Sequence, residues 1–244
     1  MTERERFHEL AARSYARDLR MFTRFLDLNG QKEAVAAANG EGCRCALFGG
    51  KDGCERKIAC FYTLDTPEEE EFPLVCLLAK PRSSRFSSAI AHRDVLGSLM
   101  SLGLEREFIG DIIMRDEGAY FFCIDKQARL IEESLTQIGG TDVDCAEAPV
   151  PEGDVRTTRD IVVQVASPRA DAVIAHLFHI PRGDMAALIN RGLVLVDDAP
   201  LAKAEKPLAE GNVISVRGHG RARICGIQSV SKKGKINLLI QLYS

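Results

Sequence analysis

His92, Arg93 and Asp94 form the tripeptide that opens the catalytic loop of protein kinases, in which the Asp is the catalytic base. Such a loop needs an Asn five residues after the Asp, and Leu99 occupies that position. The sequence also has no glycine-rich nucleotide loop, Asp-Phe-Gly, P-loop or Gly-x-Ser-x-Gly. We therefore expect no catalytic residue here, and we interpret residues 88–102 as a structural helix.

The second candidate chemistry is metal binding by cysteine and histidine. Four of the eight cysteines lie close together in the sequence: Cys43, Cys45, Cys54 and Cys60. Structural zinc sites usually take two ligands from each of two short pairs, and only one Cys-x-Cys pair is present, so buried reduced thiols are the favoured interpretation. His176 and His179 lie three residues apart without a nearby third ligand, so a partly buried or RNA-facing role is favoured over metal binding. We expect no metal and no cofactor.

The charged residues are distributed unevenly along the 244-residue chain. Residues 1–150 contain 19 Lys and Arg against 26 Asp and Glu, whereas residues 156–244 contain 13 against 7. From Arg217 onward there are six basic residues and no acidic one. A basic end on an otherwise acidic protein is typical of a polyanion-binding surface, although charge alone leaves open a surface that is basic and merely solvated.

The first 71 residues are predicted to form an N-terminal α/β domain. Apolar residues recur at helical spacing over residues 4–26, and Leu28-Asn29-Gly30 is expected to stop that helix. Residues 31–39 predict a shorter helix, and residues 44–50 and 57–64 predict a pair of strands. The acidic run Glu68–Glu71 is interpreted as a solvated loop between domains.

Residues 72–150 are predicted to alternate between strands and helices. Strands are expected over 72–80, on both sides of a turn at 116–118, and over 142–150, with helices over 88–102 and 127–139. The order β-α-β-β-α-β is that of the ferredoxin-like (RRM-like) plait. We therefore expect an α+β, multidomain protein with such a plait in the middle.

Many plaits that bind RNA stack bases on exposed aromatic residues of their central strands. The candidates here are Tyr120, Phe121 and Phe122 on the third strand, and alternation sends Phe121 to the face opposite the other two. The first strand offers no aromatic partner, and the segment is acidic. Base stacking on this sheet is therefore disfavoured.

Residues 151–167 are expected to be a linker with a leading strand, followed by a C-terminal domain over 168–244. Within that domain, helices are expected over 168–180 and 181–192, and basic loops are expected to join strands over 193–201, 212–216 and 235–243. This last segment resembles the S4 RNA-binding domain in the stretches "RADAVIAHLFHIPRGDMAALINRGLVLVDD" and "LAEGNVISV". Two departures from the family pattern are Pro181, where Ser is usual, and Asp197-Asp198, where the turn is usually Asn-Gly. The acidic pair adds negative charge near the expected RNA surface.

Other stretches narrow the resemblance to the YlmH-type family of bacterial S4-domain proteins. These are Gly49-Gly50 followed by Glu55-Arg56-Lys57, then "HRDVLGSLMSLGLEREFIGDI", and the junction "VASPRADAVIAHLF". The resemblance covers nearly the whole chain. It implies a middle plait, a C-terminal S4 domain, and a role on the large ribosomal subunit in rescue or quality control of stalled nascent chains.

Within the S4-like segment, arginines can form forked contacts to phosphate. The residues we expect to bind RNA are Arg169, Asp171, Arg182, Arg191, Lys203, Arg217, Arg221, Arg223, Lys232, Lys233 and Lys235. Asp171 could orient a nearby Arg or accept a hydrogen bond from a ribose 2′-hydroxyl, or it could simply interact with the helix dipole.

These observations favour a non-catalytic RNA-binding protein. The resemblance implies rRNA of the large subunit, tRNA and ribosome quality-control factors as partners, for a protein that is a monomer off the ribosome. The alternative is an RNA-modifying or RNA-processing enzyme anchored by its S4 domain. We expect a cytoplasmic protein without membrane contact, because the N-terminus is charged and no apolar run approaches the length of a bilayer span.

Overall fold

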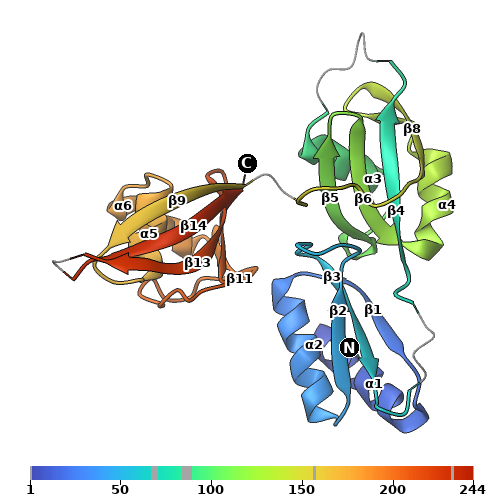
Figure 1. The fold of residues 1–244 in the computed structure, drawn as a ribbon, viewed down its shortest axis with the longest axis horizontal. Helices are drawn as coiled ribbons and strands as arrows, with labels where there is room; N and C mark the ends of the chain where they lie inside the picture. The colour runs from blue at the N-terminus through green and yellow to red at the C-terminus, as the bar shows by residue number, and fades with distance from the viewer. Residues whose placement is uncertain (1, 67–70, 84–89, 156–157, 232–233, 244) are drawn as a thin grey trace. The chain divides into compact units, whose positions relative to one another are not determined.

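A computed structural model describes residues 2–66, 71–83, 90–155, 158–231 and 234–243 of the protein (Figure 1). The chain divides into two compact units, Met1–Val155 (unit 1) and Arg156–Ser244 (unit 2). Both combine helices with antiparallel sheets, which confirms the expected α+β, multidomain class. No helix within the described ranges is long and apolar enough to cross a membrane.

The first part of unit 1 packs two helices on a small antiparallel sheet. Its elements are α1 (Glu3–Arg17), β1 (Met21–Leu26), α2 (Leu28–Gly40), β2 (Arg44–Phe48) and β3 (Lys57–Tyr62). The strand order is β1-β3-β2. Phe7 and Ala11 of α1, Ala34 of α2 and Phe61 of β3 are buried in one core, so both helices lie against the sheet.

The helix expected over residues 4–26 is wrong in its C-terminal part. Helix α1 ends at Arg17 because Asp18 adopts a left-handed conformation, with φ of 50°. Residues 21–26 form β1 and pair with β3 instead. The register of this pairing shifts between Phe22 and Phe25, and two consecutive residues, Phe25 and Leu26, are buried. The apolar residues of the strand therefore do not alternate, and their spacing resembles that of a helix.

The expected helix stop at Leu28-Asn29-Gly30 is also wrong, because these residues form the first turn of α2. Asp27 is the N-cap, and its side chain accepts a hydrogen bond of 2.8 Å from the backbone N–H of Gly30. The remainder of this helix and the antiparallel pairing of β2 with β3 confirm the prediction.

The second part of unit 1 is a five-stranded sheet with two helices. Its elements are β4 (Leu74–Pro81), α3 (His92–Ser101), the 3₁₀ helix η1 (Arg106–Phe108), β5 (Ile109–Arg115), β6 (Gly118–Ile124), α4 (Asp125–Ser134), β7 (Gln137–Ile138) and β8 (Thr141–Glu147). The strand order is β5-β6-β4-β8-β7, and all neighbouring strands are antiparallel. Apart from the short β7, the elements follow each other as the sequence indicates.

The His92-Arg93-Asp94 tripeptide forms the first turn of α3. Asp94 Oδ2 accepts a hydrogen bond of 3.1 Å from the backbone N–H of Ala91, which satisfies a donor at the start of the helix. Val95, the next residue, is fully buried in the core between the helices and the sheet. The tripeptide therefore begins and anchors a structural helix.

The two parts of unit 1 share a core on the sheet face opposite α3 and α4. Phe122 of β6 is fully buried there with Phe25 of β1 and Ile58 of β3. Gly50 lies on the Phe122 ring so closely that a Cβ would be 2.3 Å from a ring carbon. Phe121 is equally buried on the helix side. The N-terminal part therefore covers the face on which many plaits stack RNA bases.

Arg56 joins the two parts through backbone groups. Its backbone N–H donates to Oδ2 of the buried Asp111 over 2.9 Å, and its guanidinium donates to the carbonyl oxygens of Phe25 and Ile109 over 2.8 and 3.0 Å. Because these acceptors come from both β1 and β5, the Arg of the "ERK" stretch has a structural role.

Unit 2 is a six-stranded antiparallel sheet with two short helices. Its elements are β9 (Thr158–Val165), α5 (Ala170–Leu177), α6 (Arg182–Asn190), β10 (Val194–Val196), β11 (Ala199–Pro200), β12 (Val213–Val216), β13 (Gly220–Val230) and β14 (Ile236–Tyr243). The strand order is β11-β10-β12-β13-β14-β9. Val173 and Ile174 of α5 and Met185 of α6 pack into its core.

The glycine- and arginine-rich stretch 217–223, expected as a basic loop, enters a long strand at Gly220. Strand β13 pairs with β12 on one side and with β14 on the other. These two pairings outweigh the low strand propensity of glycine.

Candidate nucleic-acid interface

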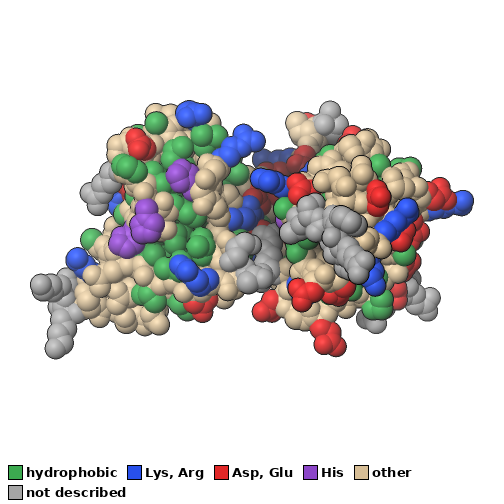
Figure 2. Space-filling view, turned by 90° about the horizontal axis from the view of Figure 1, so that it is seen from above, with side chains coloured by type: hydrophobic (Ala, Val, Ile, Leu, Met, Phe, Trp, Pro, Cys, Tyr) green, Lys and Arg blue, Asp and Glu red, His purple; other side chains and the backbone are tan. Residues whose placement is uncertain are grey.

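Unit 2 has a net positive charge, with 13 Lys and Arg against 7 Asp and Glu, although the whole chain is net negative. Figure 2 shows a face of this unit, at the left, where histidine side chains lie among hydrophobic ones with Lys and Arg side chains around them. His176, His179 and His219 are exposed residues of this unit. A basic surface with ring-bearing side chains suits a nucleic acid, which offers both phosphates and base faces.

Arg169 and Asp171 form a forked pair at the start of α5. Arg169 Nε donates to Asp171 Oδ1 over 3.1 Å, and Arg169 Nη2 donates to Oδ2 over 2.9 Å. These hydrogen bonds, together with the charge of Asp171, raise the pKa of the Arg169 guanidinium. Half of the Arg169 side chain remains exposed, at 50%. The pair therefore holds the guanidinium at the surface in one orientation.

The loop that follows β11 fixes the backbone around this pair. Ala170 N–H donates to the Lys206 carbonyl and Asp171 N–H donates to the Ala204 carbonyl, each over 2.9 Å. Lys203, one residue before Ala204, is exposed. The backbone of this loop is therefore fixed against the start of α5.

A cavity of about 490 Å³ opens beside the Arg169–Asp171 pair. Gln164 at the end of β9, His176 on α5 and Lys235 in the β13–β14 turn also line it. The Lys235 backbone is held by a hydrogen bond of 3.0 Å from its N–H to Ser231 Oγ. Cations, an amide and an imidazole thus surround one hollow, which we name the Arg169 hollow.

Arg217 lines a different hollow, of about 340 Å³, together with Gly192 and Leu193. Its backbone N–H donates to the Leu193 carbonyl over 2.9 Å. Arg191, the residue after α6, is exposed and adjoins Gly192. The expected residues that line a hollow therefore lie at two separate places in unit 2.

Arg221 is engaged within the unit. Its guanidinium donates to Asp198 Oδ1 over 2.9 Å and to Ser215 Oγ over 2.6 Å, and only 26% of its side chain is exposed. Asp198 adopts a left-handed conformation, with φ of 64°, in the turn that the sequence marks as unusual. Arg223 lies two residues further on the same strand and is half-buried. The acidic turn therefore neutralises one expected RNA contact.

Three expected residues have no described side chain. Arg182 is the first residue of α6, but its side chain lies outside the described part of the structure. Lys232 and Lys233 lie outside the described residues altogether.

Sequence reasoning did not include Gln164 and His176 among the RNA contacts. Gln164 is an exposed polar residue between the buried Val163 and Val165, and this alternation marks it as pointing away from the core. For His176 the sequence favours a partly buried or RNA-facing role over metal binding, without placing it in a site. Both line the Arg169 hollow, which depends on tertiary structure.

The cysteines and histidines form no metal site in the described ranges, where no group of three or more His, Cys, Asp or Glu side chains could hold an ion. All eight cysteines are free. Burial raises the pKa of Cys45 to about 12 and that of Cys76 to about 11, so these thiols stay protonated and unreactive near neutral pH.

Comparison with known proteins extends over most of the chain. The sequence is 32% identical over 219 residues to "Ribosome-associated protein quality control protein P2" of Bacillus subtilis (strain 168), covering 87% of this chain and 83% of that protein. Residues 67–152 match the domain family described as "Putative RNA-binding domain in YlmH". The chain belongs to the YlmH family.

Among solved structures, a YlmH-family protein shares part of the fold. "Cell division protein ylmH from Streptococcus pneumoniae" superposes with a TM-score of 0.50 at 23% identity, over 60% of this chain and 89% of that chain. At this identity the likeness concerns the fold alone.

Proposed function

We propose that the protein is a non-catalytic RNA-binding factor of ribosome-associated quality control, and that unit 2 binds rRNA of the large ribosomal subunit together with tRNA. The name of the Bacillus subtilis relative and the description of the matched domain family support this role. The activity belongs in the cytoplasm because ribosomes work there.

One observation carries the proposal: Arg169, held by Asp171 in a fork, faces a hollow shared with Lys235, Gln164 and His176. Arginine and lysine neutralise phosphates, and amide and imidazole groups can contact bases and ribose hydroxyls. This set suits a structured RNA better than an isolated anion, because it offers charge, hydrogen bonds and a ring surface together.

We assign residues 168–244 to an S4 domain and residues 72–150 to a ferredoxin-like plait. Strands β4, β5, β6 and β8 correspond to the first to fourth strands of the plait pattern. Their order in the sheet is β5-β6-β4-β8, so the first strand lies between the third and the fourth, which supports the plait. The two helices at the start of the C-terminal segment, with Arg169 before one and Arg191 after the other, support the S4 assignment.

The proposal places RNA contact on unit 2 although the matched family segment lies in unit 1. Residues 1–155 contain 19 Lys and Arg against 28 Asp and Glu, so unit 1 repels a polyanion. Its central aromatic residues Phe121 and Phe122 are fully buried and therefore cannot stack on bases.

Sedimentation with purified large ribosomal subunits tests the proposal. We expect the full chain to migrate with the subunits at low salt. If about six phosphates are contacted, its affinity should fall by roughly a thousandfold as salt rises from about 50 to 200 mM. Failure to migrate with the subunits at low salt would contradict the proposal.

A further inference from the structure

Unit 1 contains a groove of about 780 Å³ where its two parts meet. Three half-buried aromatic residues from separate segments line it: Phe22 of β1, Phe72 before β4, and Phe108 of η1. Leu74 and Val75, at the start of β4, add half-buried aliphatic surface. The groove therefore has an apolar lining that water still reaches.

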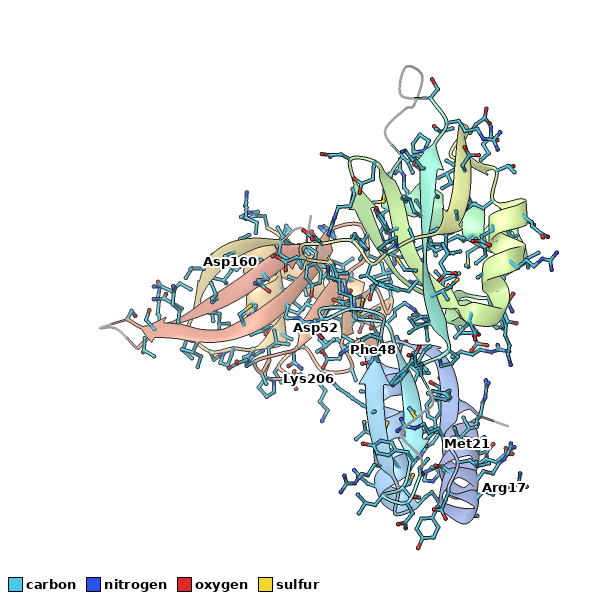
Figure 3. The ribbon with its side chains drawn as sticks, turned by 45° about the vertical axis from the view of Figure 1, so that its right-hand side comes forward. Arg17, Met21, Phe48, Asp52, Asp160 and Lys206 are labelled. Atoms are coloured by element: carbon cyan, nitrogen blue, oxygen red, sulfur yellow. The ribbon has the colours of Figure 1, made fainter. Side chains whose placement is uncertain are left out.

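Two of the three aromatic residues of the groove are in contact, and a third ring outside its lining supports them. The rings of Phe22 and Phe72 meet edge-to-face with centroids 5.5 Å apart, and Phe72 meets Phe48 at 5.4 Å. Phe48 ends β2 at the opposite end of the sheet from Met21 (Figure 3). A cluster of accessible aromatic side chains that hold each other in place is typical of an interaction surface.

The exposed charged residues that line the groove are two carboxylates and one lysine. Glu71 and Asp125 are exposed and line it, opposed by one exposed lysine, Lys126. Glu71 also ends a run of four consecutive glutamates in the sequence. A basic segment would therefore be attracted here, and a phosphate backbone would be repelled.

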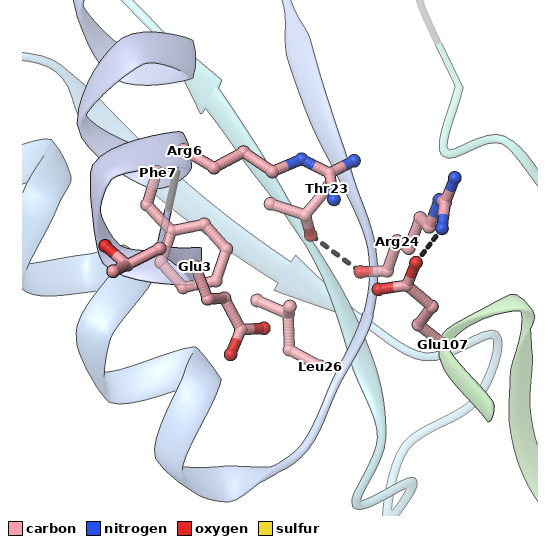
Figure 4. Close-up of a pocket in the computed structure, with 8 residues that line it drawn as sticks. Glu3, Arg6, Phe7, Thr23, Arg24, Leu26 and Glu107 are labelled. Atoms are coloured by element: carbon pink, nitrogen blue, oxygen red, sulfur yellow. Dashed lines mark hydrogen bonds and ion pairs between the residues drawn. The ribbon is translucent and has the colours of Figure 1, made fainter. Parts of the chain in front are cut away.

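Arg24, the other cation of the groove, is already engaged. It forms ion pairs with Glu105, over 2.9 Å, and with Glu107, and its guanidinium carbon lies 4.1 Å from the centroid of the Phe108 ring. Figure 4 shows the ion pair between Arg24 and Glu107. Both residues, together with Thr23, line a neighbouring pocket. Because two carboxylates neutralise Arg24, it adds no net positive charge to the rim.

We propose that this groove binds a basic peptide segment of another protein, which inserts an apolar side chain among Phe22, Phe72 and Phe108. Lysines or arginines on both sides of that side chain pair with Glu71 and Asp125. The inference goes beyond RNA binding: unit 2 contacts nucleic acid, and unit 1 contacts a protein whose charge is opposite to its own.

Fluorescence anisotropy with designed peptides tests the groove on the full chain. The probe is a fluorescein-labelled peptide of about twelve residues, rich in Lys and Arg, with two central Leu residues. A second peptide replaces both Leu residues by Ser, and a third probe is a labelled oligouridine of about the same length. We expect the Leu peptide to bind at least about tenfold more tightly than the Ser peptide, because the lining is apolar.

The second part of the test changes the protein and reverses the charge of the two acidic residues that line the groove. The double variant Glu71→Lys with Asp125→Lys should weaken binding of the Leu peptide by about tenfold. Asp52→Lys with Asp116→Lys is the control, because both residues are exposed, lie in unit 1 and are outside the groove lining. All four positions are on the surface, so the variants should fold.

The Leu peptide failing to bind, or losing equal affinity in both double variants, would overturn the proposal. Preference for the Ser peptide would overturn it as well. If Phe72→Ala weakens oligouridine binding while the Leu peptide does not bind, the groove is a single-stranded RNA site instead. None of these results bears on sedimentation with ribosomal subunits, so the two proposals can fail separately.

Discussion

Arg169 is held by both oxygens of Asp171, over 3.1 Å to Oδ1 and 2.9 Å to Oδ2, at the point where α5 begins. A guanidinium fixed by a carboxylate has lost side-chain freedom before RNA arrives, so less entropy is lost on binding. Asp171 therefore orients the Arg, as one of the sequence interpretations proposed.

Replacing Arg169 should weaken RNA binding in a salt-dependent way. We expect Arg169→Ala to reduce affinity for large-subunit rRNA by about tenfold and to lower the slope of log affinity against log salt by about one. Filter binding over a salt series measures both quantities. Arg129→Ala, which removes a surface arginine from α4 of unit 1, is the matched control and should leave both unchanged. An equal loss of RNA affinity in the two variants would show that Arg169 makes no specific contact with the RNA.

Neutralising Asp198 should strengthen RNA binding. Its carboxylate pairs with Arg221, so Asp198→Asn releases that guanidinium while Asn still tolerates the left-handed backbone. We expect about a threefold gain in affinity in the same assay. Asp160→Asn removes one exposed carboxylate from β9 of the same unit and controls for net charge. Equal gains from both variants would mean that Arg221 does not contact RNA.

Gly50 should be far less tolerant of substitution than Gly97. A Cβ at Gly50 would lie 2.3 Å from the Phe122 ring on a backbone with φ of 98°, whereas Gly97 is exposed on α3 with nothing within 4 Å. We expect Gly50→Ala to lower the free energy of unfolding of unit 1 by about 3 kcal/mol. Gly97→Ala should raise it by roughly 0.5–1 kcal/mol. Urea unfolding followed by circular dichroism measures both changes, and a stable Gly50→Ala variant would refute the close contact.

The buried thiols predict how stability and reactivity depend on pH. Burial raises the pKa of Cys76 to about 11, above the value of about 8.5 in an unfolded chain. The unfolded state therefore loses its proton first, so the free energy of unfolding should fall as pH rises from about 8.5 toward 11. At pH about 8, iodoacetamide should modify Cys76 roughly a hundredfold more slowly in the native protein than in urea. Mass spectrometry of the modified peptides measures these rates, and rapid native modification would contradict the burial.

The sequence predicted the elements whose periodicity agrees with their packing. Strands β2 to β6 and helices α3, α5 and α6 lie where apolar spacing and turn residues indicate, whereas α2 begins earlier and α4 ends earlier than expected. Strand β1 was mistaken for helix because Phe22, Phe25 and Leu26 keep helical spacing, and only pairing with β3 decides otherwise. Strand β13 was missed because its glycines and arginines signal a loop, and neighbours on both sides override that signal.

The candidate site could be predicted only where its residues are close in the sequence. Arg169 and Asp171 are two residues apart, and their pairing was one of the expected alternatives. The pairing of Arg221 with Asp198 joins positions 23 residues apart across two turns, so sequence suggested extra negative charge but not its target. The aromatic groove of unit 1 could not be predicted from the sequence, because its residues come from four distant segments.

Ultraviolet cross-linking of the full chain to large ribosomal subunits, followed by mass spectrometry of the RNA-linked peptides, tests the central claim most directly. We predict nucleotide adducts in unit 2 on peptides around Gln164–His176 and Lys235, the residues of the Arg169 hollow. The adducts should disappear at high salt. Adducts confined to unit 1, with none in unit 2, would contradict the account.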